Sequence, residues 1–287
     1  MSNNVFLLML HKDSEHVRCL INLLSSNSDV FIHVDKKCDK ALDALMNWCK
    51  INDFKHNVIF IKERIPVYWA HSSQLLATLN LIKEARKFKS YDYFTFLSGE
   101  CFPIRRLEEY DNFLRKSNGT NFLAYSDASK FHKRITMHHW GMKIGLYKSS
   151  VLVRKLFFVS SLFTNLIVKR QGPLQKMKFY KGSSWFTLHR NFIDHVIESS
   201  NNTELMRSIE YTSCVDEIFF HTLLKNSSYK DKLLENNLRF IRWSNKSNSP
   251  RRLNISDLDC FGTAFFARKL DVCDGSELSN KILSIHK

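Results

Sequence analysis

Long apolar runs, paired cysteines and glycine-rich motifs are all missing from this sequence of 287 residues. No uncharged apolar stretch approaches the roughly 20 residues that a membrane-spanning helix needs. The N-terminal run Val5–Leu10 is shorter than the core of a secretory signal peptide, and it ends in His11 without a cleavage-site pattern. The seven cysteines have no C-x-x-C spacing, which argues against a zinc site and against a disulfide framework. We therefore expect a soluble protein of the cytoplasm.

Glycine is scarce, with only eight residues, and neither G-x-G-x-x-G nor the phosphate-binding G-x-x-x-x-G-K-[ST] is present. This absence argues against a dinucleotide-binding fold and against a P-loop enzyme. No helix-turn-helix, RNP or zinc-finger pattern supports a nucleic-acid partner, despite the net charge of +15. With 44% hydrophobic and 25% charged residues, the composition is that of a folded globular protein.

Acidic residues are missing from one long segment. The 66 residues between Asp127 and Asp194 contain no acid and 13 lysine or arginine residues. The rest of the chain carries 30 lysine or arginine residues against 28 acids, so this segment supplies nearly all of the excess positive charge. Such a segment is suited to an anionic partner.

The basic segment also contains the apolar run Leu156–Phe163, with basic pairs at 154–155 and 169–170 on either side. One interpretation is a peripheral, interfacial helix that lies on an anionic membrane. The other is a core helix with solvated lysines at its ends. The sequence leaves both open.

What is present is an alternation of apolar strands and amphipathic helices, which predicts an α/β protein with a mostly parallel central sheet flanked by helices. We expect strands at Val5–Leu10, Val30–Val34, Asn57–Ile61, Tyr93–Leu97, Ser184–Leu188 and Leu238–Trp243, and helices around Val17–Leu24, Ser72–Phe88, 151–168 and from Asn191. Ligands of such sheets bind beyond the carboxyl ends of the strands. This rule selects His11, Asp35 and Ser98–Cys101.

Two adjacent carboxylates, Asp216 and Glu217, lie inside an apolar and aromatic run from Ser213 to Leu224. A carboxylate in such a place costs free energy unless something compensates it. Ser213 followed three residues later by Asp216 fits a capping box, so we expect Asp216 to secure the start of a helix. Glu217 would then be free, near the positive end of the helix dipole, to act as a general base.

Taken in order along nearly the whole chain, several short motifs resemble one known family. They are Phe31-Ile32-His33-Val34-Asp35, Trp69, Tyr91–Phe94 leading to Leu97–Ile104, Gly182–Phe186, Asp216-Glu217, Arg239–Trp243 and Phe266–Asp271. Together they resemble the core-2/I-branching β-1,6-N-acetylglucosaminyltransferase family, which also includes peptide O-xylosyltransferases and bacterial members.

The resemblance implies a GT-A-like fold and an inverting transfer of a sugar from a UDP-sugar to a hydroxyl of an acceptor glycan. Glu217 matches the family's base. Lys269, with Arg251 or Arg252, matches the basic side chains that stabilise the UDP leaving group in place of a metal ion. UDP-GlcNAc is the expected donor, with UDP-xylose or another UDP-sugar as the alternative. We expect no cofactor and no metal.

The resemblance also places the remaining site residues. Asp35 matches the strand-end aspartate that contacts uracil, although an ordinary turn residue fits the same position. His11 is expected to form a wall of the donor site. Arg134, Trp185 and Trp243 are candidate acceptor contacts, and Trp185 has a core role as its alternative.

We further expect a single domain over 1–287, with donor binding in about 1–125 and acceptor binding and catalysis in about 126–287. The acceptor would be a glycan, lipid-linked where it contacts the inner leaflet, in surface polysaccharide or lipooligosaccharide assembly. A non-catalytic module that binds glycans or membranes is the rival class.

Two positions depart from the family or imitate another one. Where the family has Ser-Gly-x-Asp-Phe-Pro, this chain has Cys101 in place of the Asp. Either Glu100 takes over the hydrogen bonds of that Asp, or the donor or acceptor preference has changed. The sequence from Asp257 to Asp259 looks like a metal-binding Asp-x-Asp, but it lies far from the strand end where that motif belongs. We interpret it as a helix start with Ser256 as the N-cap.

Overall fold

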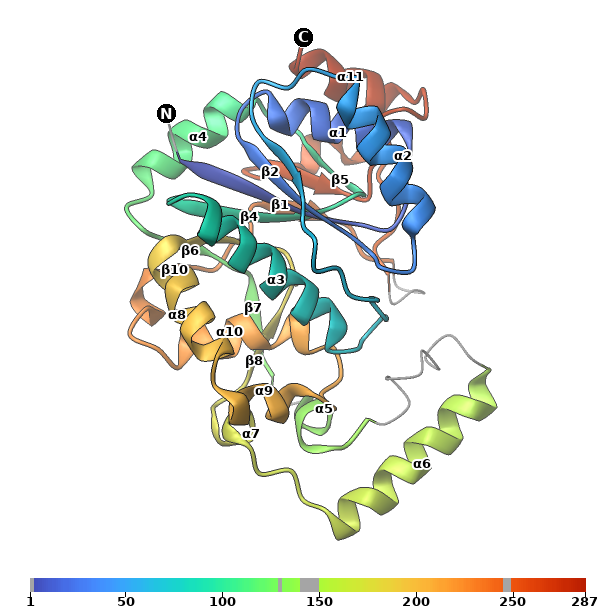
Figure 1. Cartoon of the computed structure of the whole chain (residues 1–287), viewed down its shortest axis with the longest axis vertical. Helices are drawn as coiled ribbons and strands as arrows, with labels where there is room; N and C mark the ends of the chain where they lie inside the picture. The colour runs from blue at the N-terminus through green and yellow to red at the C-terminus, as the bar shows by residue number, and fades with distance from the viewer. Residues whose placement is uncertain (1–2, 129–130, 140–149, 245–248) are drawn as a thin grey trace.

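The computed structural model describes residues 3–128, 131–139, 150–244 and 249–287. These residues form a seven-stranded sheet with the strand order β10-β6-β9-β4-β1-β2-β3 (Figure 1). Its strands are β1 (Asn4–Leu10), β2 (Asp29–Val34), β3 (Val58–Phe60), β4 (Tyr93–Ser98), β6 (Asn121–Phe122), β9 (Thr187–His189) and β10 (Leu233–Leu234). The strands from β4 to β3 are parallel, and β9 is antiparallel to both β4 and β6. The predicted α/β architecture is confirmed.

β1 is an interior strand, between β4 and β2, and both of its faces are apolar. Val5 and Leu7 enter one core cluster, whereas Phe6, Leu8 and Leu10 enter another. Successive side chains of a strand point to opposite faces, so a continuous apolar run can fill both cores.

Helices cover both faces of the sheet (Figure 1). On one side lie α1 (Glu15–Ser25), α2 (Asp39–Lys50), α4 (Leu107–Lys116) and α11 (Glu277–Ile285), and on the other α3 (Ser73–Phe88), α8 (Arg190–Ser200) and α10 (Phe219–Lys225). The short helices α7 (Pro173–Lys176) and α9 (Thr203–Ile209) pack against each other next to α5 (His132–Thr136). α1 begins where Ser14 accepts a hydrogen bond from the backbone N–H of Val17.

Two small sheets carry residues that matter for the site. β5 (Cys101–Pro103) pairs with β12 (Phe266–Arg268), which pairs in turn with β11 (Arg239–Ile241). β7 (Tyr125–Asp127) pairs with β8 (Tyr180–Gly182). Both pairings bring the second half of the chain against loops that leave the central sheet.

The predicted helix over 151–168 is present as α6 (Val151–Ile167), which lies apart from the sheet beyond α5 (Figure 1). The alternative of a core helix is wrong, because most of its apolar side chains are exposed and Ser161 is its one buried residue. No helix within the described ranges has the length and apolarity that crossing a membrane requires.

Candidate active site

The carboxyl ends of the central strands bring three predicted residues to one edge of the sheet. Asp35 follows β2, and its backbone N–H donates to the carbonyl of Leu10 at 2.8 Å, directly before His11. Gly99 follows β4, and its N–H donates to the carbonyl of Met9 at 3.3 Å. The exposed His11, Asp35 and Ser98–Cys101 therefore lie at the same edge, as the strand-end rule predicts.

Asp35 organises the loop that follows β3. One carboxylate oxygen accepts hydrogen bonds from the backbone N–H groups of Lys37 at 2.9 Å and Val67 at 3.3 Å, and the other pairs with the ammonium of Lys37 at 2.7 Å. His33 helps from the strand, since its Nε2 accepts from the N–H of Ile65 at 3.1 Å. Asp35 thus has the geometry of a strand-end turn residue, and its contact with uracil stays a prediction.

The segment before Glu217 departs from the predicted helix start. Cys214 has a left-handed backbone, with φ of 50°, and it precedes a 3₁₀ helix, Val215–Glu217, without a side-chain cap. Its N–H donates to the carbonyl of Ala70 at 2.8 Å, and the N–H of Ser213 donates to the carbonyl of Arg134 at 3.1 Å. These tertiary bonds bend the chain where a capping box needs an extended residue. The capping prediction for Ser213 and Asp216 is therefore wrong.

Asp216 points into the protein and is 7% exposed. Its carboxylate accepts hydrogen bonds from the hydroxyl of Ser184 at 2.5 Å and from Nε2 of Gln74 at 2.9 Å. Burial, together with the neighbouring Glu217 charge, raises the pKa of Asp216 to about 6. Asp216 therefore fixes the position of the segment from within, and its neighbour faces outward.

Glu217 lies between two cations. Its Oε2 is 3.0 Å from Nη1 of Arg134 in α5 and 3.1 Å from Nζ of Lys181 in β8. Both cations also lie over the ring of Phe131, at 4.8 and 4.9 Å from its centre. Oε1 has no hydrogen-bond partner in the described part of the chain, and the side chain is 29% exposed. Glu217 is thus held in place through one oxygen and keeps the other available to a substrate.

A continuous line of contacts joins this segment to Lys269. Ser184, which bonds Asp216, is followed by Trp185, and the guanidinium of Arg268 lies over the Trp185 ring at 4.3 Å from its centre. Arg268 and Lys269 both approach Oε2 of Glu100, at 3.5 and 3.4 Å. The predicted base and the predicted leaving-group cation are therefore linked through Asp216, Ser184, Trp185 and Arg268.

Arg251 and Arg252 differ sharply in what their side chains do. Arg251 makes a bidentate pair with Asp257, at 2.9 and 2.7 Å. Burial acts to raise the pKa of Asp257, but the hydrogen bonds from Arg251 and from the N–H of Asn254 outweigh it and hold that pKa below its usual value. Asp257 also completes a capping box with Asn254 at the start of the 3₁₀ helix Ile255–Cys260. The N-cap is therefore Asn254, and the prediction of Ser256 is wrong.

Arg252 is the more available of the two arginines. Its side chain is 65% exposed and lies 3.6 Å from the carboxylate of Asp271. The next residue, Leu253, donates its N–H to the carbonyl of Lys269 at 2.9 Å, which places this segment beside Lys269.

The three candidate acceptor residues differ in their exposure and in their contacts. Trp185 is 8% exposed, because Phe96 stacks on it at 5.2 Å and Arg268 covers it as well. This geometry favours its alternative as a core residue. Trp243 is 58% exposed after β11, and Arg134 is already paired with Glu217.

Cys101 occupies the position of the family's aspartate and is fully buried. Its sulfur lies 3.4 Å from both the backbone nitrogen and the hydroxyl of Ser98, so it closes the short turn between β4 and β5. The carboxylate of Glu100 points instead to Arg268 and Lys269. Glu100 is therefore paired with the two cations, and its substitution for the missing aspartate stays a prediction.

Sequence reasoning missed Lys181 and Arg268. Lys181 directly precedes the quoted motif Gly182–Phe186, and Arg268 lies inside the motif Phe266–Asp271 without an assigned role. Their importance depends on the pairings of β8 with β7 and of β12 with β5, which no local pattern reveals.

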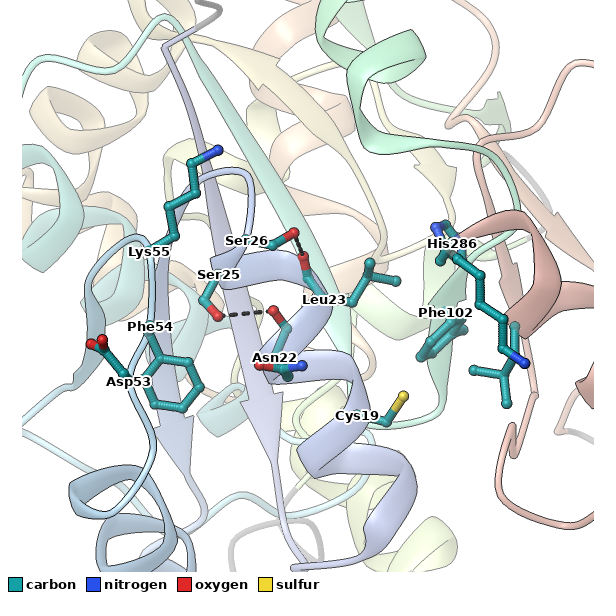
Figure 2. Close-up of a pocket in the computed structure, with 12 residues that line it drawn as sticks. Cys19, Asn22, Leu23, Ser25, Ser26, Asp53, Phe54, Lys55, Phe102 and His286 are labelled. Atoms are coloured by element: carbon teal, nitrogen blue, oxygen red, sulfur yellow. Dashed lines mark hydrogen bonds between the residues drawn. The ribbon is translucent and has the colours of Figure 1, made fainter.

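Away from this site, the described residues hold no cluster of metal ligands, and one of their cavities lies beside α1. Within residues 3–128, 131–139, 150–244 and 249–287, no three His, Cys, Asp or Glu side chains gather as metal ligands would. A cavity of about 500 Å³ lies between α1 and the end of α11 (Figure 2). The Ser25 and Ser26 hydroxyls that line it already donate to the carbonyls of Asn22 and Leu23.

The site therefore combines three features: an α/β sheet, a partly exposed carboxylate between two cations, and basic side chains near the ends of strands. Residues 5–262 match the model of the Core-2/I-Branching enzyme family. The chain therefore belongs to that family of glycosyltransferases, and its fold is the expected mixed α/β fold with a large central sheet flanked by helices.

Its relatives include two xylosyltransferases. Xylosyltransferase sqv-6 of Caenorhabditis elegans is 28% identical over 251 residues, covering 84% of this chain and 28% of that protein. Xylosyltransferase 2 of Homo sapiens is 30% identical over 222 residues, covering 75% and 23%. The apo crystal structure of mouse xyloside xylosyltransferase 1 is 11% identical, with a TM-score of 0.37, over 92% of this chain and 97% of that one. The chain spans less than a third of the length of the two relatives compared by sequence.

Gly182 controls the approach of β8 to the loop after β6. A Cβ atom at this position would lie 1.8 Å from the carbonyl oxygen of Ala124 and 2.5 Å from Nε2 of the buried His221. We expect Gly182→Ala to lower the free energy of unfolding by about 2 kcal/mol or more, because backbone atoms must move apart. Urea unfolding measures it, with the exposed Ser126→Ala on β7 as the control, expected to cost under about 1 kcal/mol. Equal urea midpoints for Gly182→Ala and wild type would show that the loop after β6 can move away from β8 without a loss of stability.

Proposed function

We propose that the protein is an inverting glycosyltransferase that moves GlcNAc from UDP-GlcNAc to a hydroxyl of an acceptor glycan, without a metal ion. The observation that carries the proposal is the placement of Glu217, with Oε2 held by two cations and Oε1 open. The family membership supports the transfer of a sugar.

In the proposed reaction, Oε1 of Glu217 takes the proton of the acceptor hydroxyl as its oxygen attacks the anomeric carbon of the donor. The new glycosidic bond forms on the face opposite UDP, and the bond from the anomeric carbon to the β-phosphate oxygen breaks. UDP leaves with the electron pair of that bond. Because attack and departure occur on opposite faces, the anomeric configuration inverts.

The departing diphosphate needs positive charge that is already in place. Lys269 supplies it, held by Glu100 at 3.4 Å, and Arg252 is the arginine we assign to the same task. Arg252 is chosen because it is largely exposed beside Lys269, whereas Arg251 is engaged in its bidentate pair with Asp257. His11 and Asp35 at the strand ends would bind the uridine.

We propose donor binding by about 1–125 and acceptor binding and catalysis by about 126–287, with Arg134 and Trp243 on the acceptor side. The acceptor is proposed to be a glycan of surface polysaccharide or lipooligosaccharide assembly, carried on lipid at the cytoplasmic leaflet. The seven cysteines, all unpaired, agree with a reducing compartment.

UDP-xylose is the second candidate donor, and the names of the relatives favour it. A thermal-shift series with UDP, UDP-GlcNAc and UDP-xylose, each with EDTA and with manganese, separates the candidates. At a hundred times its dissociation constant, the true donor stabilises the native state by about 3 kcal/mol and raises Tm by about 5 °C. We expect this shift with EDTA present. A shift that appears only with manganese contradicts the metal-free mechanism, and no shift with any UDP compound contradicts the donor class.

A further inference from the structure

α6 carries an unusually apolar outer surface. Phe163 is 64% exposed and Ile167 is 85% exposed. The exposed apolar side chains of α6 are Val151, Leu152, Leu156, Phe158, Val159, Leu162, Phe163, Leu166 and Ile167, which we call the α6 apolar surface. At 100° per residue they cover about half of the circumference of the helix. Scattered single apolar residues are ordinary on protein surfaces, but a contiguous set of this kind marks an interaction site.

The opposite side of α6 faces the protein. Ser161 is buried, Val153 and Phe157 are partly buried, and Asn165 accepts a hydrogen bond from the N–H of His138 at 3.3 Å. The helix is therefore docked by its narrow polar and semi-buried side, and the α6 apolar surface is the side that no described element covers (Figure 1).

The charge around this surface decides what covers it. Arg154, Lys155 and Lys169 are exposed on α6 or just beyond its end, and the segment from 128 to 193 contains no acid. Two copies of such a surface repel each other, whereas anionic lipid headgroups complement it. A helix with apolar side chains on one side and basic residues beside them suits the interface between headgroups and acyl chains.

We propose that α6 docks the protein onto an anionic membrane surface, lying in the plane of the headgroups with the α6 apolar surface inserted. The described helix is not long and apolar enough to cross the bilayer, so it lies on it. This inference rests on residues separate from Glu217 and Lys269 and stands independently of the donor chosen above.

The attachment of α6 also sets which side of the enzyme faces the lipid. Arg170, just after α6, donates to the carbonyl of Met137 at 3.0 Å and to the hydroxyl of Thr212 at 3.0 Å. Met137 follows α5, which carries Arg134, and Thr212 precedes the Glu217 segment. A membrane under α6 is therefore next to the acceptor side of the site, where a lipid-linked glycan would arrive.

Cosedimentation of the full chain with vesicles tests the proposal. Vesicles of phosphatidylcholine with about 30% phosphatidylglycerol should retain the protein at low salt, and pure phosphatidylcholine should retain far less. Phe163→Glu and Ser160→Glu each add one negative charge to exposed positions of α6, one inside the α6 apolar surface and one outside it. We expect partitioning to fall about fiftyfold for Phe163→Glu and about fivefold for Ser160→Glu.

The other outcomes each overturn the inference. Absence of retention on anionic vesicles at low salt, or equal losses in the two variants, removes the role of the α6 apolar surface in lipid binding. A dimer in lipid-free sedimentation velocity that Phe163→Glu abolishes assigns the surface to a second copy of the chain. Binding of UDP-sugars is measured in parallel, so failure on vesicles is separated from failure of the proposed function.

Discussion

Glu217→Gln is expected to lower kcat by about a thousandfold, because the amide cannot accept the proton of the acceptor hydroxyl. The amide keeps the shape of the side chain and can still offer its oxygen to Arg134 and Lys181, which hold Oε2 at 3.0 and 3.1 Å. Binding of the UDP-sugar should stay near normal, since the donor contacts lie at the strand ends. Single-turnover transfer and donor binding, measured on the same preparation, give the two quantities.

The control for this variant is Glu198→Gln, the same substitution at an exposed position of α8. It should change neither kcat nor donor binding. Transfer by Glu217→Gln at the wild-type rate would remove Glu217 as the base. Donor binding without transfer in wild type and variant alike would favour the rival class, a non-catalytic glycan-binding module.

The central sheet follows from sequence because its signals are local. The run Val5–Leu10 is apolar on both faces, as an interior strand of a covered parallel sheet requires, and it becomes β1. Where a strand depends on its partner, the bounds move. The expected strand Ser184–Leu188 begins at Thr187, because Ser184 turns to Asp216 and Trp185 to Arg268.

The site residues also divide into those that local sequence reveals and those that depend on distant contacts. Glu217 and Lys269 can be found from sequence motifs. The conformation of the segment before Glu217 cannot, because the backbone of Cys214 is bonded to Ala70, which lies 144 positions earlier in the chain. That bond replaces the predicted cap and sends Asp216 inward. Lys181 reaches Glu217 only because β8 pairs with β7. Local spacing contains neither contact.

α6 marks a further limit of sequence reasoning. Its length and apolar run indicated a helix, and the structure has one. Whether its apolar residues would be covered by the rest of the chain depended on where the chain placed the helix, and the periodicity of an apolar stripe is the same for a core helix and an interfacial one. Only the three-dimensional arrangement separates these readings.

Lys269→Met is expected to lower kcat by about a hundredfold, because one fixed cation for the departing diphosphate is lost. Methionine keeps most of the length of the side chain and removes the charge. Stability should change by less than about 1 kcal/mol, since the pair of Lys269 with Glu100 is partly exposed and spans 3.4 Å. Arg268 remains beside Glu100 at 3.5 Å, so that carboxylate keeps a cationic partner.

Lys281→Met on α11 is the matched control, because Lys281 is exposed and pairs only with Glu277 on its own helix among the described ion pairs. Its kcat should equal that of wild type. Lys269→Arg, which restores the charge, should recover part of the lost rate, and a merely structural role for Lys269 predicts no such recovery. If Lys269→Met keeps the wild-type kcat while Arg252→Met loses it, the leaving group is stabilised by Arg252 alone. If both variants keep it, the cation mechanism is wrong, and the charge on UDP must be met by other groups.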